Sequence, residues 1–265
     1  MPHFEASKPL PLGAKQSYFT PGSEYHGGPG QGQGTRHFNS GQSFVGNWKD
    51  DEPEGQGHLT TKEGTSYNGQ WRAGIMEGEG TYIFQAGKFP GVYGQSGYVG
   101  QWMDGKFHGK GKHMLYNGNS YDGEWKMNQK HGWGMYRVHA PTKGGLAAYE
   151  GEWVEDARTG KGISKGSDGH VEVNVYENGL RRGEGVRILD HSLFKGDAKN
   201  HYKSGWLRLM DGEEMEEIER EEAEALSAKL GIATLPSIPW PPAPEGWHEI
   251  GGTTLGPQVA VPPAK

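Results

Sequence analysis

The side chains that could do chemistry in this chain form no complete catalytic or metal-binding set. Three lysines make a local basic patch: Lys106, Lys110 and Lys112. Membrane surfaces are usually bound by more adjacent basic residues than this. Three histidines could in principle meet at a metal: His113, His131 and His139. No two histidines stand four residues apart, as in metal sites built on one helix. No Ser, His and Asp arrangement stands out as a nucleophilic set.

The glycine run at residues 28–34 is explained better by a repeat than by phosphate binding. A dinucleotide-binding loop joins a strand to a helix, whereas residues 35–41 read as a strand and a turn. The chain contains no Cys, which excludes a disulfide framework and a thiolate zinc site. We therefore expect no enzyme activity, no cofactor and no bound metal.

The most regular feature is a repeated unit, Tyr-x-Gly-x-Trp-x-x-Gly-x-x-His-Gly-x-Gly. Its well-kept copies begin at Phe44, Tyr67, Tyr98, Tyr121 and Tyr149. Their basic spacing of 23 residues is lengthened by insertions in residues 85–97 and 140–147. The same period places worn copies near residues 21, 172 and 194. Worn end units are typical of repeat arrays, in which the terminal units act as caps.

The spacing inside the unit predicts a β-hairpin. Tyr98, Gly100 and Trp102 stand two residues apart and therefore share one face of a strand, while the mostly polar residues between them point the other way. Gly109 and Gly111 are also two apart, so we expect both on one face, where they leave room for a ring of the neighbouring strand. Turn signals such as Asn-Gly connect one hairpin to the next. Together the units predict one elongated antiparallel sheet.

This unit resembles the MORN repeat (membrane occupation and recognition nexus), because five copies keep the aromatic residue, the Gly, the Trp and the Gly-x-Gly pair in register. The resemblance implies an all-β repeat array, an elongated single-layer twisted antiparallel sheet of MORN hairpins with a shallow aromatic groove. Known MORN proteins are mostly scaffolds, among them radial spoke head proteins of cilia, junctional membrane tethers and cytoskeletal ring components. The layout of this chain is similar to that of small axonemal and sperm-flagellar MORN proteins.

That resemblance implies a non-enzymatic scaffold of the cytoplasm and cytoskeleton, located at the axoneme of a cilium or flagellum. Its partners would be other axonemal or cytoskeletal proteins, including helices that lie in the aromatic groove, and open sheet edges make a homodimer or heterodimer plausible. Nucleic acid is not expected, because the chain outside its acidic segment is close to neutral, and a membrane is not the expected partner. Two alternatives remain, a regulatory module for a separate enzyme and a phosphoinositide-binding membrane tether that uses Lys106, Lys110 and Lys112.

Four segments are expected along the chain: an extended N-terminal arm (1–20), the repeat array (21–211), an acidic helix (212–231) and a Pro-rich tail (232–265). The helix would pack an apolar stripe on the aromatic face of its own sheet or of a partner's. The five repeat tryptophans are expected to form the core of the sheet and also to offer a groove to partners. The residues expected to bind partners are Trp48, Trp71, Trp102, Trp125, Trp153, Ile218, Leu226, Leu230, Trp240 and Trp247.

Overall fold

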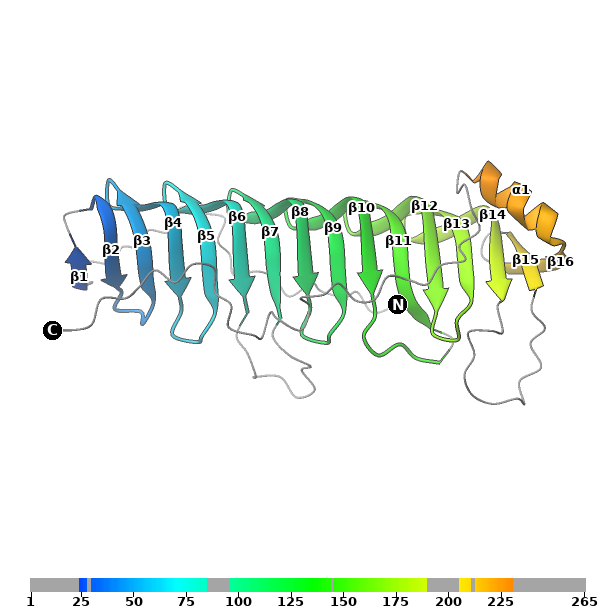
Figure 1. The fold of residues 1–265 in the computed structure, drawn as a ribbon, viewed down its shortest axis with the longest axis horizontal. Helices are drawn as coiled ribbons and strands as arrows, with labels where there is room; N and C mark the ends of the chain where they lie inside the picture. The colour runs from blue at the N-terminus through cyan, green and yellow to red at the C-terminus, as the bar shows by residue number, and fades with distance from the viewer. Residues whose placement is uncertain are drawn as a thin grey trace.

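The computed structural model of this 265-residue chain describes residues 24–27, 30–84, 96–143, 145–189, 205–210 and 213–230. Within them, sixteen strands form one antiparallel sheet in which strand order follows chain order. The sheet is elongated across its strands and ends at the helix α1 (Arg220–Lys229), drawn in orange (Figure 1). The expected fold class, an elongated antiparallel array of hairpins with a short C-terminal helix, is confirmed.

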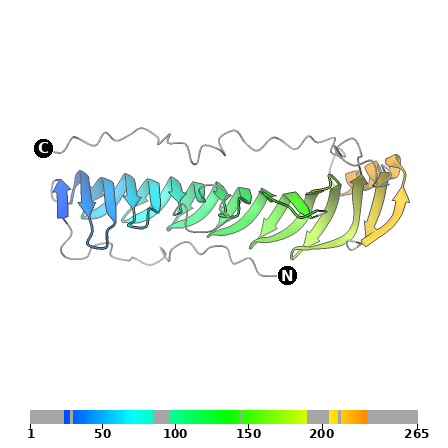
Figure 2. The same cartoon turned by 90° about the horizontal axis from the view of Figure 1, so that it is seen from below.

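The strands are 4 to 10 residues long, and Figure 2 shows how the layer twists when it is seen from below. In chain order they are β1 (Glu24–Gly27), β2 (Gly32–His37), β3 (Ser43–Lys49), β4 (Glu52–Thr60), β5 (Ser66–Arg72), β6 (Ile75–Ile83), β7 (Gly97–Met103), β8 (Lys106–Met114), β9 (Ser120–Lys126), β10 (Gln129–Arg137), β11 (Leu146–Val154), β12 (Ala157–Gly166), β13 (Val171–Glu177), β14 (Leu180–Leu189), β15 (Gly205–Met210) and β16 (Glu213–Ile218).

Each well-kept unit forms two strands joined by a tight turn. In the turn after Trp102, Asp104 and Gly105 have φ values of 51° and 71°, the pair of left-handed residues that a type I′ hairpin turn requires. Gly118, in the expected Asn-Gly turn between two units, has a φ of 80°. The start of the first worn unit and that of the last, near residues 21 and 194, lie outside the described residues.

A continuous row of glycines crosses the sheet from β1 to β12. Each of its members stands directly opposite a glycine of the next strand. The row consists of Gly27, Gly34, Gly46, Gly57, Gly69, Gly80, Gly100, Gly111, Gly123, Gly134, Gly151 and Gly162. In β13 the row is interrupted, because Asn174 stands opposite Gly162. From β1 to β12 the row therefore gives every strand the same alignment with its neighbours at this position.

The expectation that both glycines of the Gly-x-Gly pair serve one face is wrong. The pairing of β7 with β8 shifts between Gly100 and Trp102, which marks a β-bulge. Gly109 lies in that bulge with a φ of 56°, and a Cβ there would meet the side chain of Gln101. A Cβ at Gly111 would instead fall on the ring of Tyr98. The bulge inserts extra residues and so turns the first glycine toward the polar side.

The acidic segment near the C-terminus is only partly helical. A helix was expected over residues 212–231, but Glu213–Ile218 forms β16 and the helix is limited to Arg220–Lys229. β16 pairs with β15 and covers its free edge with backbone hydrogen bonds, a tertiary gain that overrides the helix propensity of glutamate. Glu219 between them is extended, with φ −75° and ψ 159°. No helix among the described residues is long and apolar enough to cross a membrane.

Candidate functional site

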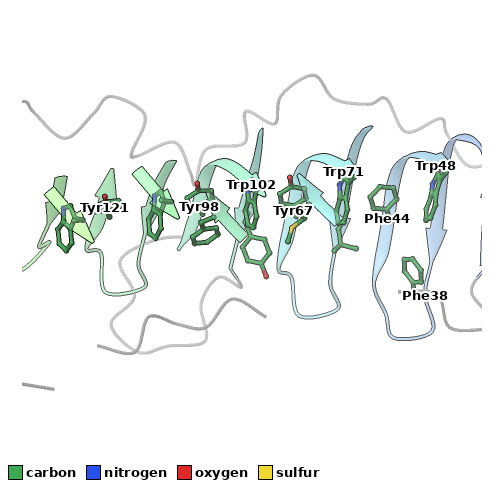
Figure 3. Packing of buried hydrophobic residues seen from close by; sticks show 14 of the residues in the cluster. Phe38, Phe44, Trp48, Tyr67, Trp71, Tyr98, Trp102 and Tyr121 are labelled. Carbon is green, nitrogen blue, oxygen red and sulfur yellow. The ribbon is translucent and has the colours of Figure 1, made fainter. Parts of the chain in front are cut away.

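One face of the sheet, which we call the aromatic face, is lined by the rings of the repeat. Figure 3 shows them following one another across the strands. The ring of Trp102 meets Tyr98 of its own unit and Tyr67 of the preceding unit edge to face, in both cases with centroids 5.2 Å apart. The same alternation continues through Phe44, Trp71, Tyr67, Trp102, Tyr98, Trp125, Tyr121, Trp153 and Tyr149. Each tryptophan thus joins two units.

The polar atoms of these rings are bonded to the backbone of the sheet. Trp102 Nε1 donates to the carbonyl oxygen of Gly80 at 3.1 Å, and the other four repeat tryptophans make the equivalent bond. Tyr98 Oη donates to the carbonyl oxygen of Gln101 at 2.9 Å. Burial raises the pKa of this phenol, so it stays protonated as a donor. The polar atom of each of these Trp and Tyr rings is therefore satisfied within the chain.

The rings fill the groove in which a partner helix was expected. The five repeat tryptophans are only 3 to 6% exposed, so little of each indole is free to contact a partner. The core role expected for these residues holds, whereas their expected role as partner-binding residues is not supported by their burial. They are Trp48, Trp71, Trp102, Trp125 and Trp153. Trp240 and Trp247 lie outside the described residues.

The aromatic series ends at a buried charged cluster in β13. Glu172 occupies the start position of its unit, where the five well-kept units have Tyr or Phe, and is 4% exposed. Arg187 binds its Oε1 through Nη2 at 2.6 Å, and Arg181 Nη1 binds Oε2 at 2.7 Å. Burial alone would raise the pKa of Glu172, but the two guanidinium groups hold it below its ordinary value. The carboxylate is therefore a structural anion held by its partners, and it needs no external ligand.

The remaining histidines of interest lie at separate places in the repeat. The carbonyl oxygens of His108 and His131 accept hydrogen bonds from Tyr98 and Tyr121, which supports the structural role expected for these two equivalent positions. His113 lies in the core against Phe107 and Trp125. Among the described residues no group of three or more His, Asp or Glu side chains is arranged to hold a metal ion.

His113 is expected to make the stability of the sheet depend on pH. Burial, followed by the charge of Lys130, lowers its pKa from 6.5 to about 4. The unfolded chain therefore binds more protons than the folded chain between these values, and stability falls as the pH drops from 6.5 toward 4. The full effect is about 3 kcal/mol. In His113→Leu, which places there the residue found at the equivalent Leu59, this part of the pH dependence should disappear.

The measurement is urea unfolding of wild type and His113→Leu between pH 4 and pH 7. Because carboxylates titrate in the same range, the informative quantity is the difference in unfolding free energy between the two proteins at each pH. His113→Gln serves as a polar control that also cannot titrate. Equal pH slopes for wild type and both variants would contradict the assignment to His113.

The basic patch expected to contact lipid lies on the other side of the sheet, which we call the outer face. Lys110 and Lys112 stand directly opposite Glu124 and Asp122 of β9, and Lys112 Nζ lies 3.0 Å from Asp122 Oδ2. Lys106 starts β8, opposite Met103. Acidic neighbours therefore offset the positive charge of the patch.

Helix α1 packs on the outer face and not on the aromatic face, where it was expected. Gly185 and Arg187 of β14 face Asn174 and Glu172 of the aromatic side, so Val186 between them points outward. Val186 packs with Ala223 and Leu226 of α1, and Ile218 packs against the same cluster.

The C-terminal end of α1 is also held on this face. Leu230 caps the helix and is half-buried. Polar contacts at the rim add to this packing, since Lys229 Nζ reaches Glu184 at 2.6 Å. The helix therefore docks on its own sheet.

Sequence reasoning treated the outer face as merely polar and missed a structural position on it. The side-chain oxygens of Gln70, Gln101, Glu124 and Glu152 accept hydrogen bonds from the backbone N–H that follows each bulge glycine. All four stand three residues after the start of their unit, and this preference for Gln or Glu is a signal that the sequence carries. The position therefore has a role in the fold.

Other outer positions change from unit to unit while the backbone stays the same. One row beside the glycines reads His58, Asn68, Thr81, Val99, Lys112, Asp122, Met135 and Glu150 across consecutive strands. The aromatic face repeats one set of side chains, whereas this row changes in charge, size and polarity. The outer face is therefore the part of the array in which each unit differs from its neighbours.

Comparison with known proteins supports the repeat assignment. The MORN repeat family matches five segments of the chain, at residues 44–66, 67–88, 98–120, 121–137 and 149–171. Each match begins at one of the five start residues found in the sequence. The MORN repeat is a non-catalytic repeat.

Three relatives share similarity with part of the chain. Alsin of Homo sapiens is 28% identical over 98 residues, which are 37% of this chain and 6% of Alsin. ALS2 C-terminal-like protein of Bos taurus is 32% identical over 106 residues, covering 40% of this chain and 11% of that protein. MORN repeat-containing protein 3 of Xenopus laevis is 35% identical over 82 residues, covering 29% of this chain and 34% of that protein. The chain thus matches only a minor part of each relative's length.

Proposed function

This chain belongs to the MORN-repeat family, and we propose that it is a non-enzymatic scaffold of the ciliary or flagellar axoneme. In this proposal it binds partner proteins through the outer face of its sheet. The axonemal location rests on the similarity of its layout to small axonemal MORN proteins. The binding role rests on the chemistry of the sheet itself.

The observation that carries the binding role is the contrast between the two faces. The aromatic face is closed by its own rings, which are 0 to 6% exposed at the start and tryptophan positions of the five well-kept units. The outer face presents a different side chain at nearly every strand on the same rigid backbone. A surface of this kind suits recognition of a partner by shape and charge, because partner choice can be altered without disturbing the core.

Retention on demembranated axonemes tests the location. We expect a fluorescently tagged chain expressed in ciliated cells to stay with axonemes after the membrane is removed with a mild detergent. A chain that is extracted with the membrane fraction would favour the membrane-tether alternative. Liposome flotation with Lys106, Lys110 and Lys112 replaced by Ser would then examine that alternative. A chain found only in compartments without cilia would contradict the proposal.

A further inference from the structure

Trp133 is an exposed indole on the outer face, at a position where the repeat does not require an aromatic residue. It is the middle residue of Gly132-Trp133-Gly134 in β10 and is 48% exposed. The equivalent positions of other units carry Gln56, Glu79, Lys110 and Lys161. Since a polar residue serves the fold at these places, the demands of the sheet do not explain the indole.

Carboxylates from the two adjacent strands surround this indole. Glu150 Oε1 of β11 accepts a hydrogen bond from Trp133 Nε1 at 3.4 Å, and Glu152 stands directly opposite Trp133. Glu124 of β9 accepts from the Trp133 backbone N–H at 3.3 Å. Among the described residues none of these three carboxylates forms an ion pair with a base. One oxygen of Glu124 and one of Glu152 accept the backbone hydrogen bonds of the bulges, but no salt bridge to a described base neutralises the charge of the three carboxylates.

Basic residues of this face lie farther from the indole than the carboxylates do. Lys110 and Lys161 flank the site on β8 and β12, each two strands from β10, which is a distance of roughly 10 Å. Arg137 stands on β10 itself, four residues from Trp133, and its charge acts on Asp122 and Glu150. By their positions in the strands, the carboxylates thus stand nearer to Trp133 than these bases do.

We propose that Trp133, with Glu150 and Glu152, binds a lysine or arginine side chain from a basic segment of a partner protein. The indole face attracts a cation through its quadrupole, and tryptophan is the best of the aromatic residues for this contact. The neighbouring carboxylates complement the charge and set the position of the cation over the ring. Met135, next on the same face of β10, offers an apolar contact to the stem of the long side chain.

This inference rests on the proposed role of the outer face in partner binding and assigns the chemistry of one partner to one site. The acidic side chains of the flanking strands indicate that the partner segment is basic. Four acidic residues of β9 and β11 point to this face: Asp122, Glu124, Glu150 and Glu152. An acidic segment would be repelled from them, so charge complementarity selects a basic one.

Fluorescence anisotropy with a short labelled peptide of alternating Lys and Ser, added to the full chain at low salt, tests the site. Trp133→Gln should weaken binding about fivefold to tenfold, the size expected of one cation–π contact. This variant places at position 133 the residue found at the equivalent Gln56, so it should fold normally. The double variant Glu150→Gln, Glu152→Gln should weaken binding to a similar extent, and glutamine at 152 retains the bulge hydrogen bond as Gln70 does.

Two controls separate this site from general charge attraction. Glu79→Gln removes an outer carboxylate two units away and should leave binding unchanged. A peptide with Glu in place of Lys should not bind. The proposal is overturned if Trp133→Gln binds the basic peptide as well as wild type does. It is also overturned if wild type binds the acidic peptide as well as the basic one, or binds neither peptide. Failure here with normal retention on axonemes would remove the cation site alone, whereas loss of retention would remove the proposed function.

Discussion

Replacing Gly100 with valine is expected to lower the free energy of unfolding by about 3 kcal/mol or more, the upper range for overpacking a well-filled core. A Cβ at this position would lie 2.5 Å from the carbonyl oxygen of Lys110 and 2.8 Å from the Tyr98 hydroxyl. Valine adds two further methyl groups to that clash. Because Gly100 stands opposite Gly80 and Gly111, relief would require the backbones of three strands to separate. Urea denaturation followed by tryptophan fluorescence measures the loss.

A matched glycine substitution shows whether that cost comes from the crowded row. Gly64 has a φ of 86°, and a Cβ there would have nothing within 4 Å. Asparagine tolerates this left-handed conformation, so Gly64→Asn should cost less than about 1 kcal/mol. If Gly100→Val proved as stable as Gly64→Asn, the ring of Tyr98 could not lie over the glycine row as described.

Truncation of Trp102 to alanine is expected to cost about 3–5 kcal/mol, the range found for deletion of a buried aromatic side chain. The change removes edge-to-face contacts with Tyr67 and Tyr98 and leaves the Gly80 carbonyl without its indole donor. Because Trp102 joins two units, its loss should also loosen the sheet between them. In hydrogen exchange, Trp102→Ala should raise the exchange rate over wild type more in β6 and β7 than in β12.

Tyrosine at the same position is the control for this prediction. Tyr176 occupies the tryptophan position of the unit that starts at Glu172 and is 3% exposed, so the fold accepts a tyrosine ring there. Trp102→Tyr should therefore retain more stability than Trp102→Ala. Equal stability of the alanine variant and wild type would contradict the view that the rings carry the core.

The face assignment of the first strand could be predicted because strand geometry alone determines it. Tyr98, Gly100 and Trp102 alternate with polar residues, and a period of two leaves one arrangement. The second strand was predicted wrongly at Gly109, because a bulge changes the period locally. That bulge is stabilised by the side chain of Gln101 from the neighbouring strand. The residue pattern of one strand cannot show a contact with the side chain of another strand.

The C-terminal segment shows a competition that composition does not decide. Its glutamates favour a helix, and Arg220–Lys229 forms one. The residues before it become β16 because the edge of β15 is available for pairing. The side chosen by α1 depends on Val186, an apolar outer residue that packs with Ala223 and Leu226 of the helix. Recognising this required the pairing of β13 with β14.

The candidate site was the least predictable part of the molecule. The tryptophans could be assigned to one face, but whether the groove stays open depends on rings from successive units meeting edge to face, which is a property of the register between strands. Trp133 carried a signal in the sequence, since it breaks the polar rule at its repeat position. Its carboxylate neighbours come from β9 and β11 and become visible only when those strands are aligned.

The regular pairing of consecutive strands also determines distances along the molecule. Each unit adds two strands, and at about 4.8 Å per strand a unit lengthens the array by roughly 10 Å. Trp133 on β10 and the α1 docking strand β14 are four strands apart, or roughly 19 Å along the sheet. Gain or loss of one unit between them would change that separation by one fixed step and leave the packing of every other unit intact. Two ligands bound at these places would be held at a separation that can change only by multiples of one unit length.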